Sequence, residues 1–152
     1  MPGVTLIASD VRTDREAIER SFAEVRDQHC PLHILGVLDM ARAARVASRF
    51  SDCGQIGSRP SEGFLKTLGT RLEQLIAVQV EEISAEAERI GLNASGQVRR
   101  GDYTTETTTA LREIQPDVVV LERRRRALLR SATSDSFLDA LQQELRFRLI
   151  EV

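Results

Sequence analysis

The sequence has no strong excess of charge of either sign, and this removes the electrostatic reason to expect two classes of partner. Its 152 residues carry 21 Lys and Arg against 23 Asp and Glu, a formal net charge of −2. A protein that binds nucleic acid or an anionic membrane through its overall charge would show a clear basic excess. We therefore expect neither nucleic acid nor a membrane as a partner.

The sequence also has few cysteines, no long apolar run and no basic residue ahead of its first apolar stretch. The two cysteines, Cys30 and Cys53, form no Cys-x-x-Cys pair and have no histidine at metal spacing. Two unpaired thiols in a reducing compartment are a simpler interpretation than one disulfide. The first ten residues place no basic residue before their apolar stretch, so we expect no signal peptide. Since no apolar run reaches the ~20 residues of a membrane helix, we expect a cytoplasmic protein.

Motifs of several enzyme classes are also missing. The sequence contains no Gly-x-Ser-x-Gly, no Walker loop and no His-Glu-x-x-His. His29 and His33 lie on either side of Cys30, but a metal site or a Cys/His nucleophile needs a third group that the sequence does not place. We interpret both histidines as ordinary surface or half-buried residues. We expect no catalytic or metal-binding residue and favour a protein that is not an enzyme.

Short apolar runs alternate with amphipathic segments along the whole chain. The runs predict strands at 4–8, 32–38, 94–100, 117–121 and 147–152. Helical spacing of apolar residues predicts helices after residue 13, at 62–92, at 102–115 and at 131–144. This order predicts a single α/β domain over residues 1–152, with a doubly wound five-stranded parallel sheet.

Local signals predict where several helices begin and end. Thr13 and Glu16 have the spacing of a capping box, which predicts Thr13 as the N-cap of the first helix. Either Asp102 or Thr104 can cap the helix that follows the third strand. Gly91 stands where a C-cap glycine would end the long helix.

Four places along the chain resemble the universal stress protein family. They are Asp10 at the end of the first strand, Val37-Leu38-Asp39 at the end of the second, Arg100-Gly101-Asp102 before the third helix, and the stretch from Asp135-Ser136 to Val152. The third is similar to the family's Gly-Asp-Pro turn, and the fourth has the spacing of its Gly-Ser, helix and final strand. Only about residues 41–61 fall outside the resemblance, and we interpret them as an insertion or loop.

The resemblance implies a Rossmann-like fold, a role in the stress response and a nucleotide site at defined positions. Asp10 and Val37 would face the base, although Asp10 can instead cap the first helix region and Val37 can belong to the core. The other implied nucleotide-binding residues are Gly101, Arg125, Arg130 and Ser136.

The phosphate-binding glycines of the family are missing from this sequence. ATP-binding members carry Gly-x-x-Gly, nine residues and then Gly-Ser or Gly-Thr, and this spacing falls here on Glu122, Arg125, Asp135 and Ser136. Glycine lets backbone N–H groups approach a phosphate closely, whereas Glu122 and Asp135 would bring negative charge to it. At ~4 Å and an effective dielectric of about 20, one like-charge pair costs up to about 4 kcal/mol, or about three decades of affinity.

Arginines follow the same strand and can offset this repulsion. The run at 123–126, together with Arg130, is the densest positive patch in the chain, and arginine binds phosphate bidentately. A rebuilt anion site is one interpretation, and a solvated loop paired with nearby carboxylates is the other. We expect a stress-related regulatory protein with an unknown protein partner and with weak or no ATP binding. The alternative is an ATP- or AMP-binding module with an arginine-rich phosphate site.

The last predicted strand, 147–152, is expected to form a sheet edge. In the family, last strands often pair across a two-fold axis, and such pairing would cover the open hydrogen-bonding groups of this edge. We therefore expect a homodimer through the C-terminal strand.

Overall fold

The computed structural model describes residues 3–8, 12–45, 62–122 and 134–152. Residues 40–45 are helical, so the predicted insertion at 41–61 lies mostly outside the described residues. The predicted alternation of strands and helices is confirmed. The elements follow in the order β1 (Val4–Ala8), α1 (Arg15–Gln28), β2 (Leu32–Asp39), α3 (Glu62–Arg89), β3 (Ala94–Gly101), α4 (Tyr103–Ile114), β4 (Val118–Leu121), α6 (Ser134–Leu145) and β5 (Arg148–Glu151).

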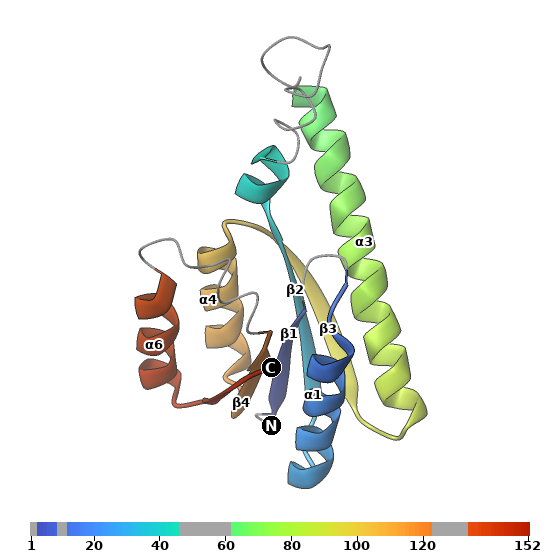
Figure 1. Ribbon diagram of the computed structural model, residues 1–152, viewed down its shortest axis with the longest axis vertical. Helices are drawn as coiled ribbons and strands as arrows, with labels where there is room; N and C mark the ends of the chain where they lie inside the picture. Colours follow the sequence, from blue (N-terminus) through green and yellow to red (C-terminus); the bar gives the residue numbers. More distant parts are fainter. Residues whose placement is uncertain (1–2, 9–11, 46–61, 123–133) are drawn as a thin grey trace.

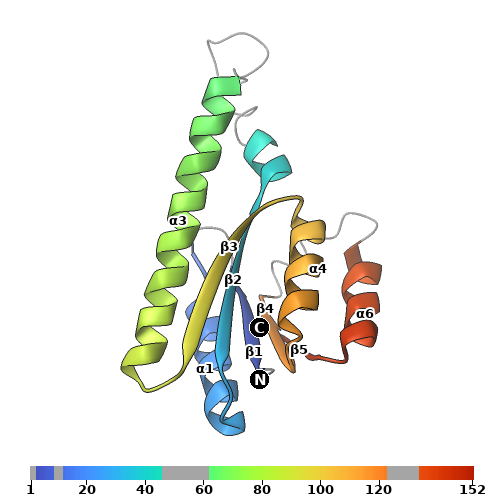
Figure 2. The ribbon, with the colours of Figure 1, turned by 180° about the vertical axis from the view of Figure 1, so that it is seen from behind.

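The five strands form one parallel sheet in the order β3-β2-β1-β4-β5. The chain builds outward from β1 through β2 to β3, then returns to the other side of β1 with β4 and β5. Helices α1 and α3 lie on one face of the sheet, and α4 and α6 lie on the other (Figures 1 and 2). The predicted doubly wound sheet is therefore confirmed.

Two hydrophobic clusters, one on each face, hold the helices to the sheet. Leu6 and Ile34 belong to the cluster under α1 and α3, whereas their neighbours Ile7 and Leu35 belong to the cluster under α4 and α6. Successive side chains of a strand point to opposite faces, so a strand covered on both faces is apolar at almost every position. The short apolar runs of the sequence are strands for this reason.

Two of the predicted helix ends are confirmed, and one is wrong. Gly91 has a φ of +86°, and Leu92 donates its N–H to the carbonyl of Ala87, which is the closure of a Schellman motif. Asp102 is the N-cap of α4. The capping box at Thr13 is not formed, because the N-cap of α1 is Asp14 and the helix begins one residue later than predicted.

Glycines in two neighbouring strands allow α3 to lie close to the sheet. A Cβ at Gly36 in β2 would lie 2.6 Å from Cγ2 of Ile76, and a Cβ at Gly96 in β3 would overlap Val80. Ile76 and Val80 are buried residues of the cluster under α3. The absence of a side chain at Gly36 and Gly96 therefore sets the distance between the helix and the sheet.

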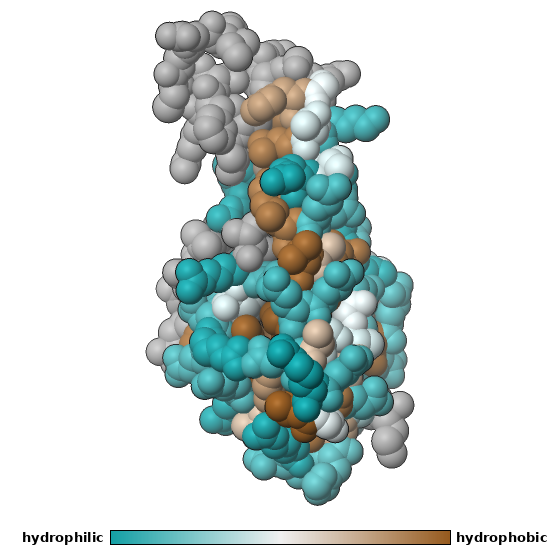
Figure 3. All heavy atoms as spheres, turned by 90° about the vertical axis from the view of Figure 1, so that its right-hand side faces the viewer, coloured by the Kyte–Doolittle hydropathy of each residue, from teal (hydrophilic) through white to brown (hydrophobic). Residues whose placement is uncertain are grey.

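Only part of α3 rests on the sheet. Its first turns project beyond the ends of the strands (Figure 1). Figure 3 shows a column of apolar side chains on the surface of this upper part of the helix. Arg100 at the end of β3 reaches α3, where its guanidinium lies 3.3 Å from the carboxylate of Glu73.

We predict that Gly36→Ala destabilises the protein by about 1–3 kcal/mol, because the added methyl group forces the packed helix away from the sheet. The matched control is Gly63→Ala, at a position in α3 where an added Cβ meets nothing within 4 Å. There the same change should leave the free energy of unfolding unchanged or raise it by up to about 1 kcal/mol. Urea denaturation measures both, and an equal effect of the two substitutions would contradict the close-approach argument.

Candidate functional site

The order of the strands reverses between β1 and β4, and this point defines the candidate site. In open α/β sheets, ligands bind outside the carboxyl ends of the strands where the order reverses. Here β1 ends at Ala8 and β4 ends at Leu121. The start of α1 lies beside them, since Asp14 contacts Glu122 directly after β4.

The side chain of Glu122 occupies this point. Glu122 is 1% exposed, and its Oε1 accepts a hydrogen bond of 2.5 Å from the backbone N–H of Asp14. The first N–H groups of a helix have no partner within the helix, and its dipole favours negative charge there. The chain thus places a carboxylate of its own at the N-terminus of α1, where an anionic ligand would otherwise be favoured.

The turn after β3 lies at the same edge of the sheet. Gly101 pairs with Asp39 of β2 and has a φ of +154°. A Cβ at this position would lie 3.0 Å from Oε1 of Glu106, so the turn requires glycine. Asp102 then accepts hydrogen bonds of 2.9 Å from both the N–H and the hydroxyl of Thr105. These bonds lower the pKa of Asp102, the backbone one most.

The two arginines before this turn are held by carboxylates of the flanking helices. Arg99 lies 2.8 Å from Glu113 and 3.7 Å from Glu106, both on α4. Arg100 points to the opposite side, to α3, through its ion pair with Glu73. Both cations therefore join β3 to its covering helices, and a phosphate at this edge would have to compete with carboxylates for them.

The predicted site residues are only partly described. Val37 is 1% exposed and belongs to the cluster under α4 and α6. Gly101 ends the neighbouring strand, and Ser136 lies in the first turn of α6. Asp10, Arg125 and Arg130 fall outside the described residues. The binding of a nucleotide by these six residues stays a prediction.

Comparison with known proteins identifies the fold. No protein-family model matches the sequence, and no curated protein matches it. Solved structures do match over the full length. The chain is similar to the hypothetical protein MJ0577 with a TM-score of 0.67 and 16% identity, covering 100% of this chain and 96% of that one.

Several further matches carry a family name, among them the following two. A protein of the universal stress protein family from Burkholderia pseudomallei matches with a TM-score of 0.62 and 15% identity, over 99% of this chain and 95% of that one. The universal stress protein from Archaeoglobus fulgidus in complex with dAMP matches with a TM-score of 0.58 and 9% identity, over 99% and 97%. This chain has the universal stress protein fold.

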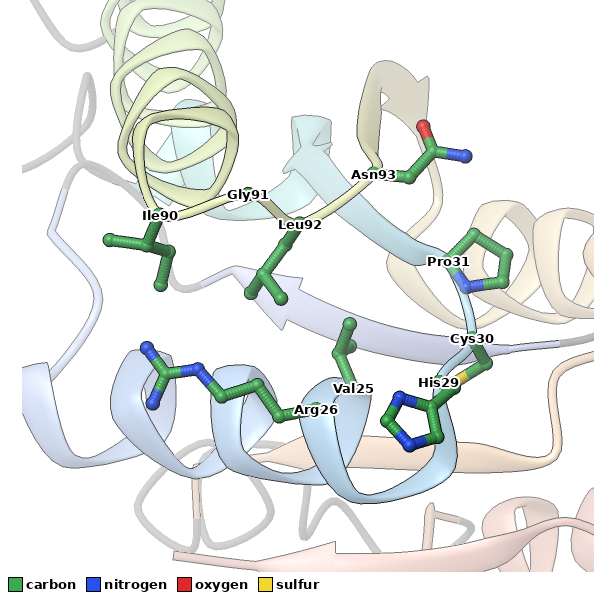
Figure 4. Close-up of a pocket in the computed structure, with 9 residues that line it drawn as sticks. All are labelled: Val25, Arg26, His29, Cys30, Pro31, Ile90, Gly91, Leu92 and Asn93. Carbon is green, nitrogen blue, oxygen red and sulfur yellow. The ribbon is translucent and has the colours of Figure 1, made fainter.

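A pocket lined by described residues lies at the opposite end of this universal stress protein fold. It has a volume of about 590 Å³ and lies between the end of α1 and the turn from α3 to β3 (Figure 4). Arg26, His29, Cys30 and Leu92 are among its lining residues. Burial raises the pKa of the Cys30 thiol, which makes it a weaker nucleophile at neutral pH. Since this is the amino edge of the sheet, the pocket is not the switch-point site.

The two histidines have structural roles. His29 ends α1 with a φ of +51°. His33 on β2 contacts β3, with its Nδ1 3.1 Å from the Ser95 hydroxyl and its Nε2 3.0 Å from the Gln97 amide nitrogen. The amide donates to Nε2, so Nδ1 carries the proton and donates to Ser95, and burial lowers the pKa of His33. Over the described ranges, no group of three or more His, Cys, Asp or Glu side chains could hold a metal ion.

Among the helices that the structure describes, none is long and apolar enough to cross a bilayer.

Proposed function

We propose that this chain is a regulatory, stress-response protein of universal stress protein type that acts in the cytoplasm through contacts with a protein partner. On this proposal it is a homodimer that binds ATP weakly or not at all. The observation that carries the proposal is the buried carboxylate of Glu122, which accepts a hydrogen bond from Asp14 at the N-terminus of α1.

The carboxylate of Glu122 weakens the binding of a nucleotide phosphate in two ways. First, it satisfies a backbone donor and the positive end of the helix dipole, so a phosphate gains less by approaching them. Second, it repels a phosphate placed beside it, by up to about 4 kcal/mol at ~4 Å and an effective dielectric of about 20. Moving the Glu122 side chain away would break its bond to the Asp14 N–H.

The second candidate is a nucleotide-binding module in which Arg125, Arg130 and Ser136 would hold the phosphates, with Asp10 and Val37 at the base. The observation that favours it is the dAMP complex of the Archaeoglobus fulgidus protein, whose fold this chain shares. Arginine side chains would then replace the backbone N–H groups that glycines expose. ATP or AMP is the cofactor that this alternative requires.

The homodimer is proposed through β5, which forms one edge of the sheet. The N–H groups of Arg148 and Val152 point to β4, because they donate to Asp117 and Leu121. Alternation along a strand therefore directs the N–H of Leu149 away from β4. A second copy of β5 placed across a two-fold axis would accept such groups and remove the open edge.

We predict that calorimetric titration of the wild-type protein with Mg-ATP gives no saturable binding below about 1 mM, equivalent to less than about 4 kcal/mol of binding free energy. The double variant Glu122→Gln, Asp135→Asn keeps the size of both side chains and removes their charges, so it should bind ATP at least tenfold more tightly. Saturation of the wild type at micromolar ATP, lost in Arg125→Glu, would establish the second candidate instead.

We further predict that Leu149→Pro halves the assembly mass measured by light scattering, because proline removes the outward N–H of the edge strand. Leu149→Ala is the matched control, since it shortens the same half-buried side chain and keeps the N–H. The alanine variant should retain the wild-type mass. Equal masses for wild type and both variants would rule out the β5 contact.

A further inference from the structure

One face of α3 carries large apolar side chains that the described part of the chain leaves exposed. Phe64, Leu75 and Val78 are 43%, 41% and 50% exposed. Figure 3 shows apolar side chains gathered in a column on the surface of α3. The buried face of the same helix is a different one, formed by Ile76 and Val80 among others. Leu75 and Val78 are therefore apolar surface that the described residues leave uncovered.

The exposed face has the spacing of a coiled-coil seam. Its residues are separated alternately by four and three positions, which is the heptad pattern of helices that pair along their length. We call this face the α3 seam, and it consists of Phe64, Leu68, Arg71, Leu75, Val78, Glu82, Ala85 and Arg89. All of these residues are exposed except Leu68, which is half-buried.

The α3 seam is complementary to itself when a second copy lies antiparallel to it. A two-fold axis between residues 76 and 77 places Leu75 opposite the partner's Val78, and Arg71 opposite the partner's Glu82. The remaining seam residues pair about the same axis, with Leu68 opposite the partner's Ala85 and Phe64 opposite the partner's Arg89. An arginine beside an aromatic ring is also a favourable contact.

We propose that a second copy of this chain docks on the α3 seam in this antiparallel arrangement. The apolar side chains of Leu75 and Val78 from both copies form its centre. The ion pair between Arg71 and the partner's Glu82 occurs twice, once on each side, and fixes the register. An interface of this kind is isologous, as a two-fold axis requires.

The charges of the seam support a second copy as the occupant. Two carboxylates of α3 have internal partners, because Glu73 pairs with Arg100 and Glu86 pairs with Arg15. Of the exposed carboxylates Glu81, Glu82 and Glu88, only Glu82 belongs to the seam. Within the described part of the chain, Arg71 and Glu82 form no ion pair. They carry opposite signs and lie at equal distances on either side of the Leu75 and Val78 pair. A partner with the matching pattern of charge and apolar residues is therefore this same helix.

The arrangement of the described elements is compatible with this contact. The first turns of α3 project beyond the sheet (Figure 1), and the later turns lie over β2 and β3 with their seam residues exposed. In the antiparallel pair, the projecting half of each helix lies along the anchored half of the other. The contact is separate from the β5 edge, because α3 covers the β3 side of the sheet. With both contacts formed, two β5 homodimers join through α3 into an assembly of four chains. The α3 contact is also independent of whether a nucleotide binds.

The test is a charge swap followed by light scattering at low ionic strength on the full-length protein. Glu82→Arg places Arg71 against an arginine of the partner at both ends and should halve the assembly mass. Glu81→Arg is the matched control, because it makes the same charge change at an exposed position that flanks the seam and does not face the partner's Arg71. The double variant Arg71→Glu, Glu82→Arg restores opposite charges and should recover the wild-type mass. High salt should weaken the wild-type contact.

The same seam variants made in a Leu149→Pro background, which lacks the β5 contact, test the α3 contact by itself. In that background, the assembly should still fall from twice the chain mass of 17.0 kDa to a single chain when Glu82→Arg is added. Circular dichroism confirms that each variant is folded. A monomeric Leu149→Pro protein, an equal effect of Glu81→Arg and Glu82→Arg, or a double variant that stays dissociated would each overturn the proposal.

Discussion

The hydrogen bond between the buried carboxylate of Glu122 and the backbone N–H of Asp14 is the interaction on which this account depends. It joins the end of β4 to the start of α1 at the point where the strand order reverses. That point is where a doubly wound sheet offers its ligand site. By placing its own negative charge there, the chain stabilises its fold with the same helix terminus that would otherwise attract a phosphate.

The other described charged residues at the carboxyl edge are also engaged within the fold. Arg99 and Arg100 are paired with carboxylates of α4 and α3, and Asp102 is engaged in capping α4. Charged groups at this edge therefore hold helices to the sheet. The surfaces that the described residues leave open are of a different kind: the edge of β5 and the apolar seam of α3. Both suit contacts with protein more than contacts with a small anion, and this contrast supports the proposed regulatory role.

Most of the fold could be predicted from the sequence, because local patterns determine it. Apolar runs located the strands, and the turn chemistry of Gly91 and Asp102 located two helix ends. The prediction of Thr13 as an N-cap was wrong, because the side chain of Thr13 is buried and Asp14 takes that position instead. The bond from Asp14 to Glu122 spans 108 residues, so no local pattern could reveal it. The sequence marked Glu122 only as a replaced glycine.

The central claim is that a carboxylate of the chain stands where a nucleotide phosphate would bind. The most direct measurement is native mass spectrometry of the protein purified from cells without added nucleotide, followed by denaturation to release any bound small molecule. The account predicts that the native mass equals that of the polypeptide assembly, with no nucleotide released. A stoichiometric adenine nucleotide carried through purification would contradict it, and would show that phosphate displaces Glu122 or binds beside it.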